Sequence, residues 1–470
     1  MSAEADSDGA GWGALFRGEH GLYTALVIIA VACHALQILV IAIIMPTVVA
    51  DLGGADYYTW PAMVYTIGAI VGSAGVGPVW AKLGRRGGLI LGGFIFIVGS
   101  VGCALAPDMA TLNIARTIQG FAGGLINGGA MEMVSGLFTP ARRKRVLALT
   151  QGVWMTAQLS GPIVGGAFAE IGWWRGSFWV MLPIVAPLMI LAWYRIPAAH
   201  GRAAEGRGSQ RLPFMRLGML TAGVFCIGLA GPLHHTGLRI LLITGAVFLV
   251  GLTLRFDRAA DNRLYPSGTL SITSQVGPAL WIFFLVGMVQ TTVMLFVPLL
   301  LQVVHGVTPL FISFVSIVIS FGWTAATFMV SGHSERREDR ALAAGPVLMV
   351  FGLGGMTLAT AYPALWPLTG AALILGAGVG LHHVLLVART MGQAVAGEER
   401  ITAAALPSVR AIGTAFGAAL GGMLSIMAGL GDATDPAAVG PAIVFVYGVN
   451  LVPVLAAAGL MIWLVRPAKR

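Results

Sequence analysis

Charged residues are scarce in this chain. Only 10% of its 470 residues are charged and 57% are hydrophobic, which gives a mean hydropathy of +0.86. A soluble chain carries ~25% charged residues. This composition nearly excludes a water-soluble protein and predicts an all-α integral membrane protein.

Cysteines and catalytic motifs are also scarce. The three cysteines lie in apolar runs without CxxC spacing, and the histidines form no metal motif, so neither a disulfide framework nor a metal site is expected. No glycine-rich phosphate loop with its lysine and no serine nucleophile elbow is present. We therefore expect no cofactor and no enzyme activity. A channel or sensor is disfavoured too, because the chain has no ring-forming filter and no soluble signalling domain.

Long apolar runs dominate what is present, and each is close to the ~20 residues that a helix needs to cross a bilayer. The predicted spans, fourteen in all, are 22–50, 58–80, 88–106, 109–138, 146–170, 174–196, 214–233, 237–255, 274–303, 308–331, 341–361, 364–389, 400–429 and 440–465.

The basic residues indicate the orientation of these spans. With the N-terminus in the cytoplasm, the outer loops hold little positive charge beyond Arg175 and Arg239. The inner loops and tail hold Lys82, Arg85, Arg86, Arg142, Arg143, Lys144, Arg145, Arg202, Arg207, Arg211, Arg258, Arg263, Arg336, Arg337, Arg340, Lys469 and Arg470. This asymmetry follows the positive-inside rule. It explains the net charge of +9 without a nucleic-acid partner and predicts that both termini are cytoplasmic.

A polar, glycine-rich and basic segment at 197–213 divides the chain and predicts a cytoplasmic linker. The predicted parts are a tail at 1–21, a six-helix bundle at 22–196, this linker, two inserted helices at 214–255, a cytoplasmic loop at 256–273, a second six-helix bundle at 274–465 and a tail at 466–470.

The two six-helix halves show a weak internal repeat. Gln37 matches Gln290, and Arg116 corresponds in position to His382 and His383. The fifth span of the first half reads GPIVGGAFA from Gly161, and its counterpart reads GTAFGAALGG. Two-fold repeats of this kind are typical of secondary transporters, whose binding site lies near the bilayer midplane.

Four short motifs occur in order on the expected spans. They are Leu112, Arg116, Gln119 and Gly120 on the fourth span; Gly161, Pro162, Gly165 and Gly166 on the fifth; Trp174, Arg175, Phe178 and Pro183 at the sixth; and Arg410 and Gly413 on the thirteenth. In these motifs the chain resembles the major facilitator superfamily, and most of all its fourteen-span drug:proton antiporter branch. The resemblance implies the major facilitator fold with two pseudo-symmetric bundles, a bacterial cytoplasmic (inner) membrane location, and export by alternating access.

The chain departs from that branch at three acidic positions. Gln37 stands where the branch has a first-span acid, Ala81 replaces the aspartate of the loop after the second span, and Gly136 replaces an acid at the inner end of the fourth. Proton coupling therefore stays open.

Arg116 is the first candidate for the substrate site, because an arginine within a span is costly unless it faces protein or a water-filled cavity. It binds an anionic group or controls a proton site in one interpretation, and it bonds to carbonyls and side chains of neighbouring spans in the other. Asn127 lies within ~20° of it on a helical wheel.

Other polar residues are expected to line the same site. His34 and Gln37 share one face of the first span, and the alternative for each glutamine is an interhelical hydrogen bond. Only one of the adjacent His382 and His383 can face inward. The remaining candidates are Gln119, Gln151, Trp154, Gln158, Gln290 and Arg410.

Glu132 lies ~160° from Arg116 on the wheel, near the cytoplasmic end of its span. We expect it to pair with Lys82, Arg85 or Arg86 as a gate; the alternatives are a proton-coupling carboxylate and a purely structural pair. The fifth-span Gly161, Pro162, Gly165 and Gly166 interrupt an apolar segment and are predicted to let the helix bend.

Together these residues predict a secondary active transporter that exports a small neutral or anionic amphipathic compound. Cationic substrates are disfavoured because the inferred cavity is poor in carboxylates. The alternative is an importer or uniporter of an organic acid. The expected partners are a small-molecule substrate, membrane lipid and, if coupling exists, protons; the expected state is a monomer.

Overall fold

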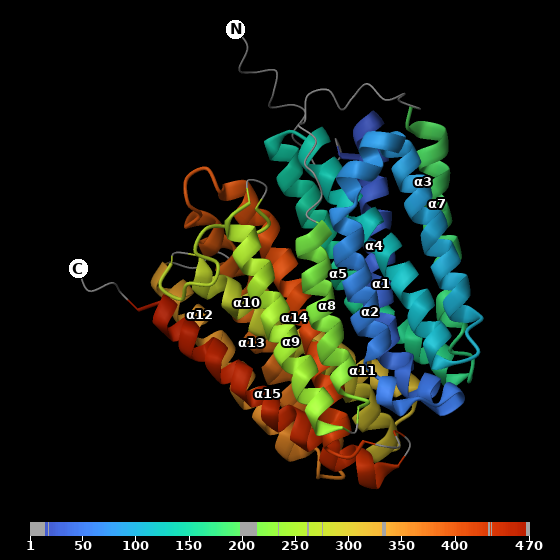
Figure 1. Cartoon of the computed structure of the whole chain (residues 1–470), viewed down its shortest axis with the longest axis vertical. Coiled ribbons are helices and arrows are strands. Elements are labelled where there is room, and N and C mark those ends of the chain that lie inside the picture. Colours follow the sequence, from blue (N-terminus) through green and yellow to red (C-terminus); the bar gives the residue numbers. More distant parts are fainter. Residues whose placement is uncertain are drawn as a thin grey trace. The chain divides into compact units, whose positions relative to one another are not determined.

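The computed structural model describes residues 15–16, 18–197, 214–233, 235–260, 263–274, 276–330, 335–430, 433 and 435–466. Within these residues the regular structure is helical, with no strand (Figure 1). Most of the predicted linker and of both predicted tails lies outside the described residues.

The helices of the first half are α1 (Gly18–Leu52), η2 (Ala55–Tyr57), α2 (Trp60–Ala74), α3 (Val76–Ala104), α4 (Met109–Leu137), α5 (Pro140–Glu170), α6 (Gly176–Trp179) and α7 (Met181–Arg195). They are followed by α8 (Phe214–Ala230), α9 (Thr236–Arg258), α10 (Gly277–Leu299), η3 (Leu300–Val304), α11 (Pro309–Val330), α12 (Glu335–Ala359), α13 (Leu365–Gly392), α14 (Glu399–Met427) and α15 (Pro436–Leu464).

In the described part of the chain, 10 helical segments are long and apolar enough to cross a membrane, with α6 and α7 counted as one. The expectation of a multi-pass helical membrane protein is confirmed. The count of fourteen spans also needs α2, α4, α5 and α8, which are shorter or more polar, and it stays a prediction.

The basic stretch between the second and third predicted spans is not the open loop that the sequence suggested. α3 begins at Val76 and contains this stretch, and the chain departs from helical geometry at Gly84 (φ 67°, ψ 175°). A positive φ of this size is accessible to glycine without steric cost. A single residue therefore makes the turn, and the flanking basic residues stay helical.

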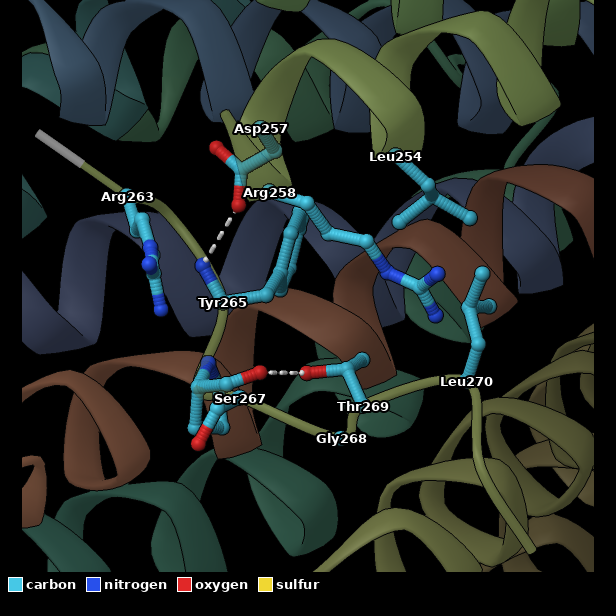
Figure 2. Close-up of a pocket in the computed structure, with 10 residues that line it drawn as sticks. Leu254, Asp257, Arg258, Arg263, Tyr265, Ser267, Gly268, Thr269 and Leu270 are labelled. Atoms are coloured by element: carbon cyan, nitrogen blue, oxygen red, sulfur yellow. Dashed lines mark hydrogen bonds between the residues drawn. The ribbon is translucent and has the colours of Figure 1, made fainter. Parts of the chain in front are cut away.

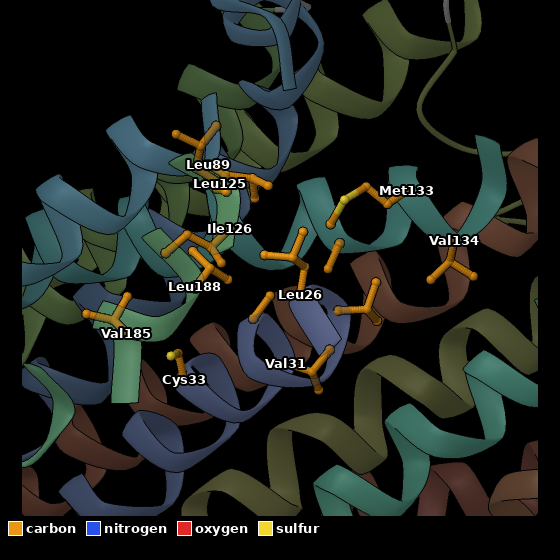
Figure 3. Packing of buried hydrophobic residues seen from close by; sticks show 14 of the residues in the cluster. Leu26, Val31, Cys33, Leu89, Leu125, Ile126, Met133, Val134, Val185 and Leu188 are labelled. Atoms are coloured by element: carbon orange, nitrogen blue, oxygen red, sulfur yellow. The ribbon is translucent and has the colours of Figure 1, made fainter. Parts of the chain in front are cut away.

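The helices group into two compact units. The first comprises Met1–Ile41 and Ile67–Leu212, and the second comprises Ala42–Thr66 and Pro213–Arg470. A buried apolar core in the first unit joins α1, α3, α4 and α7, with Leu26, Leu125 and Val185 among its members (Figure 3). In a membrane, such packing is favoured by close van der Waals contact more than by removal of apolar surface from water.

Glycines bring particular helices of each unit into backbone contact. A Cβ on Gly124 of α4 would lie 2.0 Å from the carbonyl oxygen of Ala69 on α2. In the second unit, a Cβ on Gly376 of α13 would lie 2.0 Å from the carbonyl oxygen of Ile319 on α11. These helices are the fourth and second of their respective halves, so the repeat inferred from sequence recurs as a packing pattern.

Helices α8 and α9, which the sequence predicts to be an inserted pair, lie side by side, and α8 also packs on α14 (Figure 1). Only 11% of the apolar 18-residue stretch of α9 is buried. Arg216 at the start of α8 forms a buried ion pair with Asp257 at the end of α9. A salt bridge therefore joins the two helices at one end, and α9 is largely exposed.

Candidate functional site

Arg116 is the centre of a polar cluster in the first unit. Its side chain is completely buried. Nη1 donates to Oε1 of Gln37 (2.9 Å) and to Oε1 of Gln119 (2.6 Å), and Nη2 lies 3.5 Å from the backbone oxygen of Gln37. The guanidinium of α4 is thus held against α1 by hydrogen bonds from a charged donor, which are stronger than neutral ones.

Gln119 connects this cluster to α3. Its Nε2 donates to Oγ of Ser100 (2.8 Å), which donates in turn to the carbonyl oxygen of Phe96 (2.8 Å). The approach of the two helices is close, because a Cβ on Gly99 would lie 2.6 Å from the backbone nitrogen of Gln119. Gln119 is therefore a positioning residue that fixes the orientation of the guanidinium.

Gln37 retains one unused donor. Arginine can only donate, so the amide atom that faces Arg116 is the oxygen, and Nε2 points elsewhere. This Nε2 is buried and has no hydrogen-bond partner among the described residues. An unsatisfied buried donor costs about 1–3 kcal/mol, so an acceptor supplied from outside the protein would stabilise this arrangement.

The other predicted residues of the first unit lie on the same helices. The ring of His34 on α1 packs edge-on against Trp154 of α5, with centroids 6.3 Å apart. Asn127 on α4 and Gln158 on α5 are half-buried, and Gln151 is exposed. The structure joins Gln37 and Gln119 to Arg116 directly. A place for Asn127, Gln151 and Gln158 in the same site stays a prediction.

A second polar cluster surrounds Arg410 on α14. Nη2 donates to Oε1 of Gln290 on α10 (2.8 Å), and Nη1 lies 3.3 Å from Nε2 of His383 on α13. Since arginine has no acceptor, that nitrogen of His383 is the acceptor, and its ring proton is on Nδ1. The guanidinium carbon also lies 5.2 Å from the ring centroid of Trp323.

The two adjacent histidines have different environments. The ring of His383 contacts both Phe283 and Trp323, with centroids 5.5 Å apart in each case. His382 is buried instead against α12, and its Nδ1 lies 2.7 Å from the carbonyl oxygen of Gly378 on its own helix. His383 is thus the histidine of the Arg410 cluster, and His382 packs between helices.

The Arg410 cluster adjoins a small cavity and carries a net positive charge. Gln290 lines a cavity of about 10 Å³, which is the size of one water molecule, together with apolar side chains of α10, α11, α12 and α13. Within the described residues, no carboxylate lies within ion-pair distance of Arg410. A buried cation surrounded by neutral groups favours a ligand that is anionic or rich in hydrogen-bond acceptors.

The predicted gate residues lie at one end of α3 and α4. Glu132 is half-buried, Lys82 is exposed and Arg85 is half-buried. The guanidinium carbon of Arg86 lies 4.3 Å from the ring centroid of Trp193 on α7. The pairing of Glu132 with these cations stays a prediction.

The fifth-span motif does not interrupt its helix, because α5 runs from Pro140 to Glu170 through Pro162. A Cβ on Gly161 would lie 3.0 Å from Cβ of Leu39 on α1, and Gly165 and Gly166 are buried. The glycines therefore act here as a close-packing surface, and a bend of the helix at this motif stays a prediction.

Sequence reasoning missed Ser100, Phe283 and Trp323. Each lies within an apolar run, and no periodicity distinguishes it from lipid-facing or packing residues. Only the fold shows that Ser100 supports Gln119 and that Trp323 lies beside Arg410.

Comparison with known proteins identifies the family. A sequence model of the Major Facilitator Superfamily matches residues 27–418. This chain belongs to the Major Facilitator Superfamily. The probable multidrug-efflux transporter Rv1634 of Mycobacterium tuberculosis is 30% identical over 411 residues, covering 84% of this chain and 85% of that protein. Multidrug resistance protein 3 of Bacillus subtilis is 24% identical over 380 residues, covering 77% and 71%.

Solved structures agree on the fold. A D-xylose–proton symporter superposes with a TM-score of 0.64 at 15% identity, covering 94% of this chain and 97% of that one. The nucleoside transporter NupG gives 0.62 at 11% identity, covering 94% and 99%. Membership confirms the resemblance inferred from the motifs and identifies the chain as a membrane transporter and not an enzyme.

Gln119→Leu is expected to destabilise the protein by about 1–3 kcal/mol, because it removes the buried hydrogen bonds that Gln119 makes with Arg116 and with Ser100. The matched control is Gln151→Leu at an exposed position of α5, for which a change in stability within about 0.5 kcal/mol is expected. Thermal unfolding of the purified variants in one detergent measures both. Equal stability of the two variants would show that Gln119 does not support the cluster.

Proposed function

We propose that this transporter exports a small neutral or anionic amphipathic organic compound by alternating access. The observation that carries the proposal is the unused, buried Nε2 donor of Gln37 beside the guanidinium of Arg116. Both groups offer protons and accept none in this arrangement, so a ligand that meets them must bring acceptors.

The chemistry of the neighbouring groups supports an amphipathic ligand. His34 and Trp154 supply an aromatic surface on α1 and α5, and the half-buried Asn127 and Gln158 supply neutral polar groups. A cationic ligand would find a guanidinium where it needs a counter-charge, and leaving a charge unpaired in a desolvated site is costly. We also propose Arg410, Gln290 and His383 as a second polar binding site, within the second unit.

The direction of transport rests on relatives. The Mycobacterium tuberculosis protein is named as a multidrug-efflux transporter and the Bacillus subtilis protein as a multidrug resistance protein. These names support export. The unused donor of Gln37 is equally suited to a carboxylate, so import of an organic acid is the second candidate. Flux measured in vesicles of known orientation distinguishes the two.

Arg116 provides the test of the substrate site. Two amphiphiles with the same aromatic body, one with a carboxylate and one with a quaternary ammonium group, should differ in affinity, with the carboxylate favoured. Arg116→Lys keeps the charge but loses the planar fork, and Arg116→Gln loses both. We expect the affinity for the carboxylate to fall in that order, by about tenfold or more for Arg116→Gln, in calorimetric titration.

The control variant is Arg195→Gln, which removes the same charge from an exposed position at the end of α7. It should bind like the unmodified protein. A folded Arg116→Gln protein with unchanged affinity, or a preference for the ammonium compound, would remove Arg116 and the anionic substrate from this proposal.

We further propose fourteen spans with both termini in the cytoplasm, in the cytoplasmic membrane of a bacterium. The basic loops support this orientation. In a cysteine-free background, single cysteines placed in 197–213 should react with an impermeant maleimide only after the cells are opened. Single cysteines placed in 431–438 should react in intact cells. The reverse pattern at either segment contradicts the topology.

Glu132 is proposed to pair with Lys82 or Arg85 and to stabilise one gate state. If so, Glu132→Gln changes the balance of inward-open and outward-open forms and leaves the pH dependence of flux in place, because the carboxylate is not the coupling group. Accessibility of reporter cysteines and flux at several pH values measure the two properties. Loss of pH-dependent transport with substrate exchange preserved would instead assign proton coupling to Glu132.

A further inference from the structure

A pocket of about 340 Å³ lies in the second unit where the chain leaves α9 and turns towards α10 (Figure 2). One wall is the last turn of α9, with Leu254 and Arg258. The rest is the connecting segment from Arg263 to Leu270. This pocket is unrelated to the two arginine clusters, and the proposed transport mechanism does not use it.

The connecting segment is held in place from two sides, so the pocket is preformed. Asp257 is buried and paired with Arg216, and its carboxylate accepts from the backbone nitrogens of Leu264 (2.9 Å) and Tyr265 (3.0 Å). On the other side, the carboxylate of Glu398 accepts from the backbone nitrogen of Ser267 (2.8 Å) and from its hydroxyl (2.7 Å).

Both acidic groups near the pocket are therefore engaged, and Arg258 remains to meet a ligand. Arg258 is exposed and extends across the pocket between Leu254 and Leu270 (Figure 2). No ion pair engages it in the described part of the chain. The side chain of Arg263 is 39% exposed and forms an ion pair with Glu398, with 3.6 Å between Nη1 and Oε1.

The remaining lining groups add no charge. Burial raises the pKa of Tyr265 to about 12, so its hydroxyl is neutral at physiological pH. Thr269 donates its hydroxyl proton to the backbone oxygen of Pro266 (2.6 Å). Its oxygen and the apolar carbons of Leu254 and Leu270 complete a pocket in which the guanidinium of Arg258 lies beside apolar side chains (Figure 2).

An uncovered apolar stripe on α9 leads into this pocket. Ile240, Val247, Gly251, Leu254 and Arg258 follow one another at steps of seven, four, three and four residues, which places them on one face of the helix. Ile240 is 56% and Val247 is 69% exposed. A helix that crosses the bilayer presents such a face to acyl chains.

We propose that this pocket binds the phosphate of an anionic phospholipid, whose acyl chain lies along the stripe of α9. Basic pockets beside membrane helices recognise anionic head groups, and the guanidinium of Arg258 matches a phosphate. The apolar stripe favours a lipid over a soluble phosphate. A zwitterionic head group is disfavoured, because Asp257 and Glu398 are already engaged and leave no carboxylate for an ammonium group.

The test uses the full-length protein in detergent. Native mass spectrometry counts bound lipids after addition of phosphatidylglycerol, phosphatidylcholine or inorganic phosphate. The variants are Arg258→Gln, Arg258→Lys and the matched control Arg255→Gln, which removes an exposed arginine one turn earlier that does not line the pocket.

We expect phosphatidylglycerol, and not phosphatidylcholine, to be retained by the unmodified protein and by Arg255→Gln. Retention of phosphatidylglycerol should fall about tenfold in Arg258→Gln and less in Arg258→Lys. The lysine variant keeps the charge and the fold even where glutamine is poorly tolerated. Equal retention by Arg258→Gln and Arg255→Gln, or equal retention of phosphatidylcholine, would overturn the proposal. If millimolar inorganic phosphate displaced the bound lipid, and if retention did not depend on the acyl chains, the pocket would be assigned to a soluble anion. That result would overturn the lipid proposal.

Discussion

The constraint on which the rest of this structure depends is the placement of cations inside an apolar helix bundle. A charged side chain at the centre of a span costs at least ~2.5–3.5 kcal/mol, so the protein must provide partners for it. Here the partners described for Arg410 and Arg116 are neutral: glutamine oxygens, an imidazole nitrogen and an aromatic ring. Neutral acceptors satisfy hydrogen bonds without cancelling the charge of the arginine.

The buried arginine lies on a different helix in each unit. In the first unit the arginine is on α4 and in the second it is on α14, yet in each case the acceptor is a glutamine on the first helix of the half. The glycine contacts between helices are more alike in the two units. They are contacts of the backbone, so they do not depend on which side chains each unit carries. The helix packing is thus conserved between the units more strictly than the chemistry it supports.

Sequence reasoning predicted the helical membrane class, the family and a shared polar site for Gln37 and Arg116, because hydropathy, loop charge and short motifs are local signals. It could not distinguish His382 from His383, since adjacent residues on a helix differ only in the neighbours that tertiary packing provides. It marked Gly161–Gly166 as a place where the helix can bend. α5 continues through Pro162, and the packing of Gly161 on Leu39 is visible only when α1 is in place.

The ion pair between Arg216 and Asp257 has a consequence for the history of the chain. It brings the beginning of α8 next to the end of α9, so the polypeptide enters and leaves this hairpin at nearly the same point. A segment with adjacent ends can be gained or lost without rerouting the helices on either side. The salt bridge therefore makes α8 and α9 a self-contained hairpin.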